Sequence, residues 1–414
     1  MRVSTSMIYD KGIAAIQRQT AELLHTQQQV ASGRRILTPA DDPIAAARAL
    51  EIDQSRAINA QFKINQGYAE DNLRLMENRL VGIGDILLYA HERAVQAASP
   101  ILSENELGFI ATDLRAHFEA LLGFANARDA NGEYVFAGYK AGTKPFEGGL
   151  GAVSYEGDQG VRTIQVSSSR FLPISFPGTE LFAKTQPVGD HLVTANVGVR
   201  ADGTANLGNG TLSGGVAAGF PNDPADYDLL GRRLEILFNG TDYDVYEYIP
   251  GVAGRQTVQV GLADLADLGD PLSPAYRGVS VVPSGTPQAG DRFEVFVASP
   301  DVFANLAVFI DALEQPGPSG MKGGAVEFAT AQLDVALDNI LRVRARVGSQ
   351  LVEVERLNDV GSDLDLQYAQ TLSRLQDVDY AEAISRLTQQ QTFLEAAQQS
   401  YLRVTGLSLF NFLS

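Results

Sequence analysis

The stretch FKINQGYAEDNLRLMENRLVGIGDILLYAHERAVQA, residues 62–97, decides the fold. Its apolar and small residues recur at the heptad spacing of helices that pack side by side. A pattern this long favours a coiled coil over a globular helix, although a helix pair within one chain would use the same seam equally well. The seam positions are Phe62, Ala69, Leu73, Met76, Leu80, Ile83, Leu87, Ala90, Ala94 and Ala97.

Helix stop and start signals surround this seam. Ser32-Gly33 ends a first helix, because Gly commonly follows a helix C-terminus. Asp42 suits the N-cap and Pro43 the first position of a long helix that runs to about residue 99. After a Ser-Pro break, a second helix is predicted for residues 103–129.

Both ends of the chain carry weaker seams that include polar residues, at Thr20, Gln27, Gln391, Gln398 and Thr405. Helices of this kind gain little free energy from folding alone. We therefore expect the two ends to pack together and to complete their folding on assembly. The predicted subunit contacts are Ile13, Ile16, Leu23, Val30, Leu387, Leu394, Tyr401, Leu409 and Phe410.

The middle of the chain, about residues 148–324, holds roughly two-thirds of the 40 Gly and most of the 17 Pro, which favour turns and strands over helices. Residues 233–238 and 241–248 are predicted to form two strands around a primed Asn-Gly turn. Residues 292–297 alternate like a strand. Just before this region, a tight Asn131-Gly132 turn is expected to lead into a strand at 133–136.

The C-terminal part returns to helix with a seam whose register is interrupted. Heptad spacing holds through Val347, and Leu351 and Val354 follow after one extra step of four. Such a stutter unwinds a coiled coil locally without ending it. The seam before it consists of Leu333, Ala336, Ile340 and Val343.

Composition excludes several classes of protein. The net charge is −18 and no basic run is present, which argues against nucleic-acid binding and against binding to anionic membranes. There is no Cys, so disulfides and thiolate zinc sites are excluded. No apolar run approaches the length of a membrane span, and the N-terminus does not resemble a cleaved secretory signal.

No catalytic, metal or cofactor site is predicted. The four His, at 25, 91, 117 and 191, are far apart, and Val95 stands where a metalloprotease helix needs its second His. Two groups of Asp, at 223, 226 and 228 and at 264, 267 and 270, could in principle bind calcium but do not fit an EF-hand loop. We interpret them as solvated loop acids, and Asp41 and Asp42 as helix caps.

Two stretches resemble the flagellin family of bacterial proteins. Ala31 to Ile36, followed by Asp41-Asp42-Pro43, is similar to its N-terminal signature, and Asp379 to Leu413 is similar to its C-terminal signature. Within the family, Pro39 to Pro43 and the segment 136–146 resemble the members at the hook–filament junction. The family-motif residues are Ser32, Gly33, Arg35, Asp41, Asp42 and Pro43.

The resemblance implies a structural subunit outside the cell, exported by the flagellar type III apparatus without a cleaved signal peptide. Implied partners are hook-associated protein 1, flagellin, further copies of the chain in a helical ring, and a cytoplasmic export chaperone. Two alternatives stay open: the filament flagellin itself, and an enzyme or binding protein that carries coiled-coil arms.

The expected fold is an elongated, flagellin-like α+β chain. Its N- and C-terminal helices pack as an antiparallel coiled coil, and a β-rich domain is inserted in the middle. Three domains are predicted: a terminal helical domain of residues 1–42 and 376–414, a helical bundle with a β-hairpin of residues 43–182 and 301–375, and an outward β-rich domain of residues 183–300.

Overall fold

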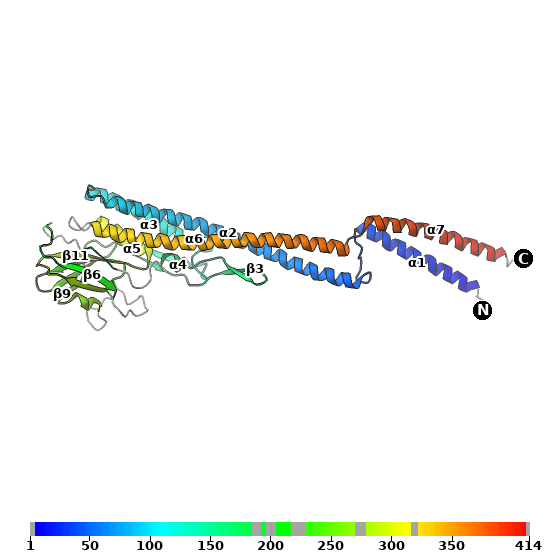
Figure 1. The fold of residues 1–414 in the computed structure, drawn as a ribbon, viewed down its shortest axis with the longest axis horizontal. Helices are drawn as coiled ribbons and strands as arrows, with labels where there is room; N and C mark the ends of the chain where they lie inside the picture. The colour runs from blue at the N-terminus through cyan, green and yellow to red at the C-terminus, as the bar shows by residue number, and fades with distance from the viewer. Residues whose placement is uncertain are drawn as a thin grey trace. The chain divides into compact units, whose positions relative to one another are not determined.

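The fold is taken from a computed structural model that describes residues 5–183, 192–195, 200, 204–216, 229–269, 279–315 and 322–410. The chain mixes long helices with short antiparallel strands (Figure 1). It divides into two compact units, residues 1–66 with 356–414 (unit 1) and residues 67–355 (unit 2). The predicted division into three domains, with boundaries at residues 42, 182, 300 and 375, stays a prediction.

The long seam of residues 62–97 lies in helix α2 (Pro43–Ala97), as the sequence predicts. Nine of its ten predicted positions are buried, and Phe62 is half-buried. The partner is helix α6 (Lys322–Gln376), which runs antiparallel to α2 within each unit. In unit 1 the amide of Asn59 donates to the carbonyl of Gly361 at 2.7 Å, and in unit 2 Arg344 pairs with Glu77 at 2.9 Å.

The predicted stutter in α6 is wrong. Buried positions continue from Val347 to Gln350 and Val354, which keeps alternating steps of three and four. Gln350 is only 7% exposed, whereas Leu351 is half-buried beside it. A regular helix presents the same face every seven residues, so the register of the surrounding seam places the polar residue inside.

Helix α3 also departs from prediction at one end. It spans Glu104–Ala125, with a capping box formed by Ser103 and Glu106, and so ends four residues before the predicted limit. The tight turn predicted at Asn131-Gly132 is present, with the amide of Gly132 donating to the carbonyl of Asp129 at 3.1 Å, but the strand expected at 133–136 is not. Gly132 has a φ of +83° as a turn requires, but Tyr134 makes only an isolated bridge to Arg128. The segment folds back as turns that bury Val135 and Phe136.

The strands of unit 2 form a five-stranded antiparallel sheet and three two-stranded sheets. The large sheet has the order β5-β11-β7-β8-β9, and the pairs are β1-β2, β3-β4 and β6-β10. The strands are β1 (Phe146–Gly149), β2 (Ala152–Tyr155), β3 (Thr163–Ser167), β4 (Arg170–Pro173), β5 (Leu192–Ala195), β6 (Thr211–Val216), β7 (Arg232–Phe238), β8 (Tyr243–Tyr248), β9 (Gln256–Leu262), β10 (Val279–Ser284) and β11 (Arg292–Val297).

The predicted hairpin is present, but its turn differs. β7 and β8 pair from Arg233 with Tyr248 to Phe238 with Tyr243, so residues 239–242 form the loop. A primed two-residue turn needs positive φ at its first central position, and the type I′ form needs it at both. Gly240 has a φ of +109°, but Asn239 does not have positive φ, and its side chain instead accepts from the amides of Thr241 and Asp242.

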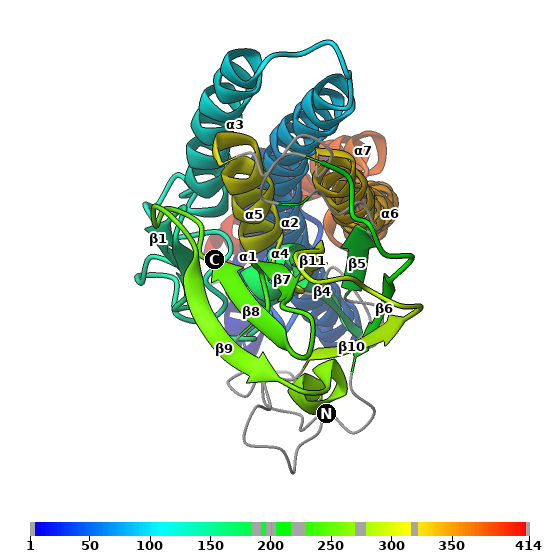
Figure 2. The same cartoon turned by 90° about the vertical axis from the view of Figure 1, so that its left-hand side faces the viewer.

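The sheet packs against helix α5 (Val302–Glu314), which in turn contacts α3 (Figure 2). Phe303 of α5 lies 5.7 Å, ring centre to ring centre, from Phe118 of α3. On the other side it stacks at 5.3 Å on Phe182, the last residue of the short helix α4 (Gly178–Phe182). Unit 2 therefore has an aromatic core that joins α3, α4 and α5.

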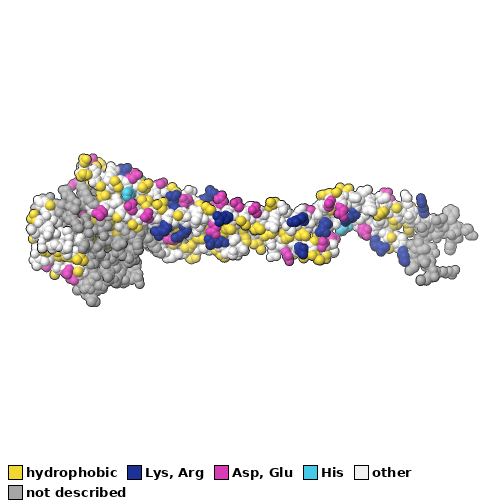
Figure 3. Space-filling view, viewed as in Figure 1, with side chains coloured by type: hydrophobic (Ala, Val, Ile, Leu, Met, Phe, Trp, Pro, Cys, Tyr) yellow, Lys and Arg dark blue, Asp and Glu magenta, His cyan; other side chains and the backbone are white. Residues whose placement is uncertain are grey.

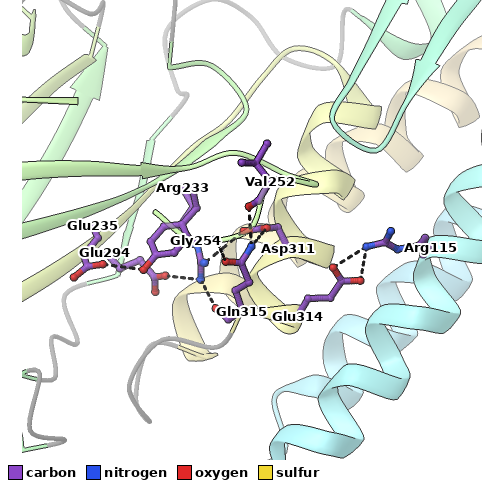
Figure 4. A network of polar contacts seen from close by, with 10 residues as sticks. Arg115, Arg233, Glu235, Val252, Gly254, Glu294, Asp311, Glu314 and Gln315 are labelled. Carbon is purple, nitrogen blue, oxygen red and sulfur yellow. Dashed lines mark hydrogen bonds and ion pairs between the residues drawn. The ribbon is translucent and has the colours of Figure 1, made fainter. Parts of the chain in front are cut away.

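A buried charge network ties the sheet to α5 (Figure 4). Arg233 of β7 pairs with Glu294 of β11 at 3.3 Å and with Asp311 of α5 at 3.4 Å. The three side chains are 2–3% exposed. The Arg233 guanidinium also lies 3.9 Å from the ring centre of Tyr248 and donates to the carbonyl of Gln315 at 3.1 Å. The Arg233 guanidinium thus forms ion pairs with two buried carboxylates, one on strand β11 and one on helix α5.

Glu294→Gln is expected to weaken the pH dependence of stability. Burial raises the pKa of Glu294 to about 7, and Arg233 only partly offsets this, while Glu235 and Asp311 raise it further. The folded chain therefore keeps a proton between the ordinary value of 4.5 and about 7 that the unfolded chain has released. The resulting stabilisation is complete below that ordinary value and is lost as the pH rises through about 7.

Urea unfolding at about pH 5 and about pH 8 checks this prediction. The fall in unfolding free energy between the two pH values should be smaller in Glu294→Gln than in the wild type. Burial raises the pKa of Asp301 to about 7 as well, so the variant keeps part of the fall. If the unfolding free energy falls equally in the wild type and in Glu294→Gln, Glu294 is not a source of the pH dependence.

Candidate assembly site on the terminal helices

Helices α1 (Thr5–Ser32) and α7 (Tyr380–Phe410) pack side by side in unit 1 (Figure 1). They are antiparallel, because Gly12 lies beside Tyr401 and Gly33 beside Tyr380. The approach is close at both places, since a Cβ on either Gly would lie 2.9 Å from the Tyr side chain. The start of α1 and the end of α7 are therefore at the same end of the pair.

The seam of α1 differs from the predicted one at Ile13 and Gln27, while the predicted position Thr20 is half-buried, as is its neighbour Gln19. Ile16, Leu23 and Val30 are half-buried, as expected for seam residues. Ile13 is 44% exposed and Gln27 is exposed, whereas Gly12 and Thr26 are the less exposed neighbours. The less exposed row is Gly12, Ile16, Gln19, Leu23, Thr26 and Val30.

The seam of α7 shows the same change. Leu387, Leu394 and Tyr401 are half-buried as predicted, but Gln391 and Gln398 are exposed. The less exposed row is Ala383, Leu387, Gln390, Leu394, Ala397 and Tyr401. The side chains of Thr405, Leu409 and Phe410 lie outside the described residues. The role of the nine predicted residues in subunit contacts stays a prediction.

The seam of this pair remains polar. Thr26 is buried and donates to the carbonyl of Glu22 at 3.1 Å, within its own helix. Gln29 is buried and donates to the carbonyl of Arg35 at 2.6 Å. The amide oxygen of Gln390 is buried and has no hydrogen-bond partner. The pair therefore buries less apolar surface than the α2 seam, and part of its polar surface is unsatisfied.

A short backbone bridge joins the segment after α1 to the segment before α7. Arg34 and Asp377 form an antiparallel β-bridge. The amide of Arg35 donates to the carbonyl of Gln376 at 2.6 Å, and the amide of Val378 donates to that of Gly33 at 2.9 Å. We name residues 33–42 together with 375–379 the joint.

The motif residues build this joint. Gly33 has a φ of +72°, a conformation that other residues rarely adopt. Ser32 accepts from the amide of Arg34 at 3.3 Å. The guanidinium of Arg35 donates to the carbonyl of Leu375 at 2.7 Å and to Asp42 at 3.3 Å. Arg35 therefore links both chain segments of the joint.

Asp42 is a helix cap, as predicted from the sequence, whereas Asp41 binds amides of the loop before it and caps no helix. Asp42 accepts from the amide of Ala45 at 3.0 Å at the start of α2, where Pro43 takes the first helical position. Asp41 accepts from the amides of Leu37 and Thr38. These backbone donors lower the pKa of both carboxyl groups, that of Thr38 acting most strongly on Asp41 and that of Ala45 on Asp42. Both acids are therefore ionised at neutral pH.

Sequence reasoning missed three contributors to the joint. Asp379 caps α7 by accepting from the amides of Ala381 and Glu382, and its place before an apolar helix is a usable signal. Gln29 and His25 gave no signal, because their partners lie outside their own helix. His25 contacts Asp41 at 3.0 Å through its Nε2 atom.

The His residues and loop acids that the structure describes outside the joint lie apart from one another. His91 contacts Asp334 at 3.3 Å, and the ring of His117 lies 4.2 Å from that of Tyr89. Asp264 caps a short 3-10 helix by accepting from the amide of Ala266. Asp223, Asp226, Asp228, Asp270 and His191 lie outside the described residues. Across the described ranges, no three His, Asp or Glu side chains cluster as a metal site would require, and no helix has the length and apolarity of a membrane span.

Comparison with known proteins identifies the architecture. Residues 3–141 match the bacterial flagellin N-terminal helical region. Over 410 residues, 99% of each chain, the protein is 26% identical to flagellar hook-associated protein 3 of Salmonella typhimurium. It is 28% identical, with the same coverage, to the protein of that name from Escherichia coli. The N-terminal third of the chain is thus similar to flagellins, and the whole chain is similar to hook-associated protein 3. Its fold is similar to that of Xanthomonas campestris FlgL, at 25% identity and a TM-score of 0.50, over 78% of this chain and 99% of that one.

All six motif residues lie inside the matched region, which also contains α1, α2 and α3. The motif therefore has a physical explanation that does not involve a ligand. Its side chains and Gly33 close the joint and cap α2 through backbone hydrogen bonds.

Proposed function

We propose that this chain is a structural subunit of the bacterial flagellum that joins the hook to the filament of flagellin. The similarity to hook-associated protein 3 along the whole chain carries the proposal. The antiparallel α1–α7 pair supports it, because its polar and incompletely satisfied seam suits a helix pair that is completed by neighbouring subunits. The role is mechanical, and no catalytic step is assigned.

The proposed partners follow from a place between hook and filament. On the hook side the partner is hook-associated protein 1, on the filament side it is flagellin, and around the axis it is further copies of this chain. Contacts that repeat around an axis without pairing identical patches are heterologous. Before export through the type III apparatus, a cytoplasmic chaperone would cover the C-terminal helix. The mature location is extracellular, at the hook–filament junction.

The filament flagellin is the second candidate and has less support, because the curated relatives similar over the whole chain are both hook-associated proteins. Immunogold electron microscopy of flagellated cells, with antibody to residues 229–315, separates the two. We expect one narrow band where hook meets filament. Label along the whole filament would assign the chain to flagellin, and absence of label from flagella would overturn the proposal.

A further inference from the structure

Arg233 lies between two acids that belong to different elements of unit 2. Its guanidinium nitrogens lie 3.3 Å from Glu294 of β11 and 3.4 Å from Asp311 of α5. Both distances are longer than the about 2.8 Å of a short charge-assisted hydrogen bond, so the cation is shared. Charged side chains along the long helices lie at the surface, where water solvates them (Figure 3). The three side chains of this network are only 2–3% exposed, so they depend on one another.

Glu294 has fewer partners for its charge than Asp311 has. Its Oε2 atom is buried and accepts no hydrogen bond. On the neighbouring strands, Glu235 of β7 lies opposite Glu294 on one side and Ala195 of β5 on the other. The other charged and titratable groups of this face all contact Glu235, and they are Arg255, Arg292 and Tyr248. Within the described residues, an ionised Glu294 therefore depends on Arg233 alone.

The same cation anchors the end of α5 and the loop between β8 and β9 (Figure 4). Arg233 donates to the carbonyl of Gln315 at 3.1 Å, and the side-chain amide of Gln315 donates to Asp311 at 2.7 Å. The amide oxygen of Gln315 accepts from the backbone amide of Gly254 at 3.0 Å, and its nitrogen donates to the carbonyl of Val252 at 3.3 Å. Arg233 therefore acts on the loop through Gln315.

The protonation of Glu294 decides how Arg233 is shared. Burial raises the pKa of Glu294 to about 7. Burial raises the pKa of Asp311 as well, but from a lower ordinary value of 3.8, and the contacts with Arg233 and Gln315 oppose the rise. Asp311 is therefore ionised before Glu294 as the pH increases. Once Glu294 is ionised too, two anions compete for one cation, and the attraction that holds α5 becomes weaker.

We propose that Arg233 is a pH-sensitive switch between the sheet and the end of α5. While Glu294 is neutral, Arg233 holds the last turn of α5 on the sheet, and through Gln315 it holds the β8–β9 loop. When Glu294 is ionised, Arg233 moves toward β11, and the end of α5 and the loop are loosened. Residues 251–255 of the loop are exposed, so little buried surface holds them otherwise. The inference goes beyond the proposed function, because it concerns the isolated chain and no other flagellar protein.

Hydrogen exchange of the full-length chain tests the switch. Exchange is followed by mass spectrometry at about pH 6 and about pH 8 and is corrected for the intrinsic effect of pH on amide exchange. In the wild type, the protection of peptides that contain residues 249–255 and 311–315 should fall by about tenfold between the two pH values. The protection of the α2 seam at residues 69–90 should not change, which would show that the opening is local.

Two variants distinguish a switch from a network that is only structural. Glu294→Gln cannot ionise, so Arg233 stays with Asp311, and protection of the loop should equal the higher wild-type level at both pH values. In Asp311→Asn the only acid left for Arg233 is Glu294, so protection should equal the lower wild-type level at both. Glu353→Gln, at the exposed pair with Arg170, is the matched control and should keep the tenfold fall of the wild type.

The switch is wrong if the wild type shows no fall in protection with pH, or if Glu294→Gln shows the same fall as the wild type. Low protection in both variants at both pH values would mean that the network is only structural, which also overturns the proposal. Circular dichroism shows whether each variant is folded. If Glu294→Gln does not fold, the wild type and Asp311→Asn still decide, because an equal fall in these two would contradict the role of Asp311.

Discussion

Arg233→Ala is expected to lower the free energy of unfolding at about pH 8 by about 3–5 kcal/mol. The substitution removes the cation that Glu294 and Asp311 share, and both carboxyl groups are almost completely buried. It also removes the ring contact with Tyr248. A loss of this size lowers the melting temperature by about 4–6 °C in a chain of this length, which thermal unfolding followed by circular dichroism would detect.

Two further measurements show whether buried charge is the cause. At about pH 5 the loss should shrink, because burial raises the pKa of both Glu294 and Asp311 and protonation removes the unpaired charge. Replacing Arg233, Glu294 and Asp311 together by Met and Leu should restore much of the stability. Arg170→Ala, at an exposed pair with Glu353, is the matched control and should leave the melting temperature almost unchanged. If Arg233→Ala and Arg170→Ala lower the melting temperature equally, the buried network does not stabilise the packing of the sheet against α5.

Spacing in the sequence predicted the long helices well because their apolar residues repeat without a gap. The predicted seam was wrong where a polar residue occupies a seam position. Hydrophobicity favours Leu351 over Gln350 as the seam residue. Val347 and Val354 are both buried, however, and in a regular helix Gln350 lies on the same face as these two residues and is buried with them. At Gln390 and Gln391, and at Thr26 and Gln27, both neighbours are polar, so hydrophobicity could not choose between them.

The candidate site could be predicted in part. Local rules identified Gly33, Asp42 and Pro43, because the partners of a cap or a C-terminal Gly are the next few amides and carbonyls. The bonds from Arg35 to Leu375 and from Gln29 to Arg35 depend on how distant segments meet, and no local pattern encodes them. The same holds for Arg233, whose partners lie 61 and 78 residues away along the chain.

Leu394→Asp is expected to reduce incorporation into flagella by more than about tenfold while the isolated chain keeps its melting temperature. Leu394 is half-buried in the α7 seam, in line with Leu387 and Tyr401. Burying a Leu side chain contributes about 1.5–3 kcal/mol, and a carboxylate in that place would also be desolvated. Unit 2 has its own aromatic and apolar core, so the loss should appear in assembly and not in the fold of the chain.

Gln391→Asp is the matched control for this variant, one turn earlier on the exposed side of the same helix. It introduces the same charge without placing it in the seam, so incorporation should remain near that of the wild type. Immunoblots of isolated flagella give the ratio, and thermal unfolding of the purified chains gives the comparison of stability. Equal loss with both variants would mean that charge on α7, and not the seam, limits assembly. A large fall in melting temperature with Leu394→Asp would mean that the α1–α7 pair is already folded in the isolated chain and contributes to its stability. Assembly would then not be needed to complete its folding.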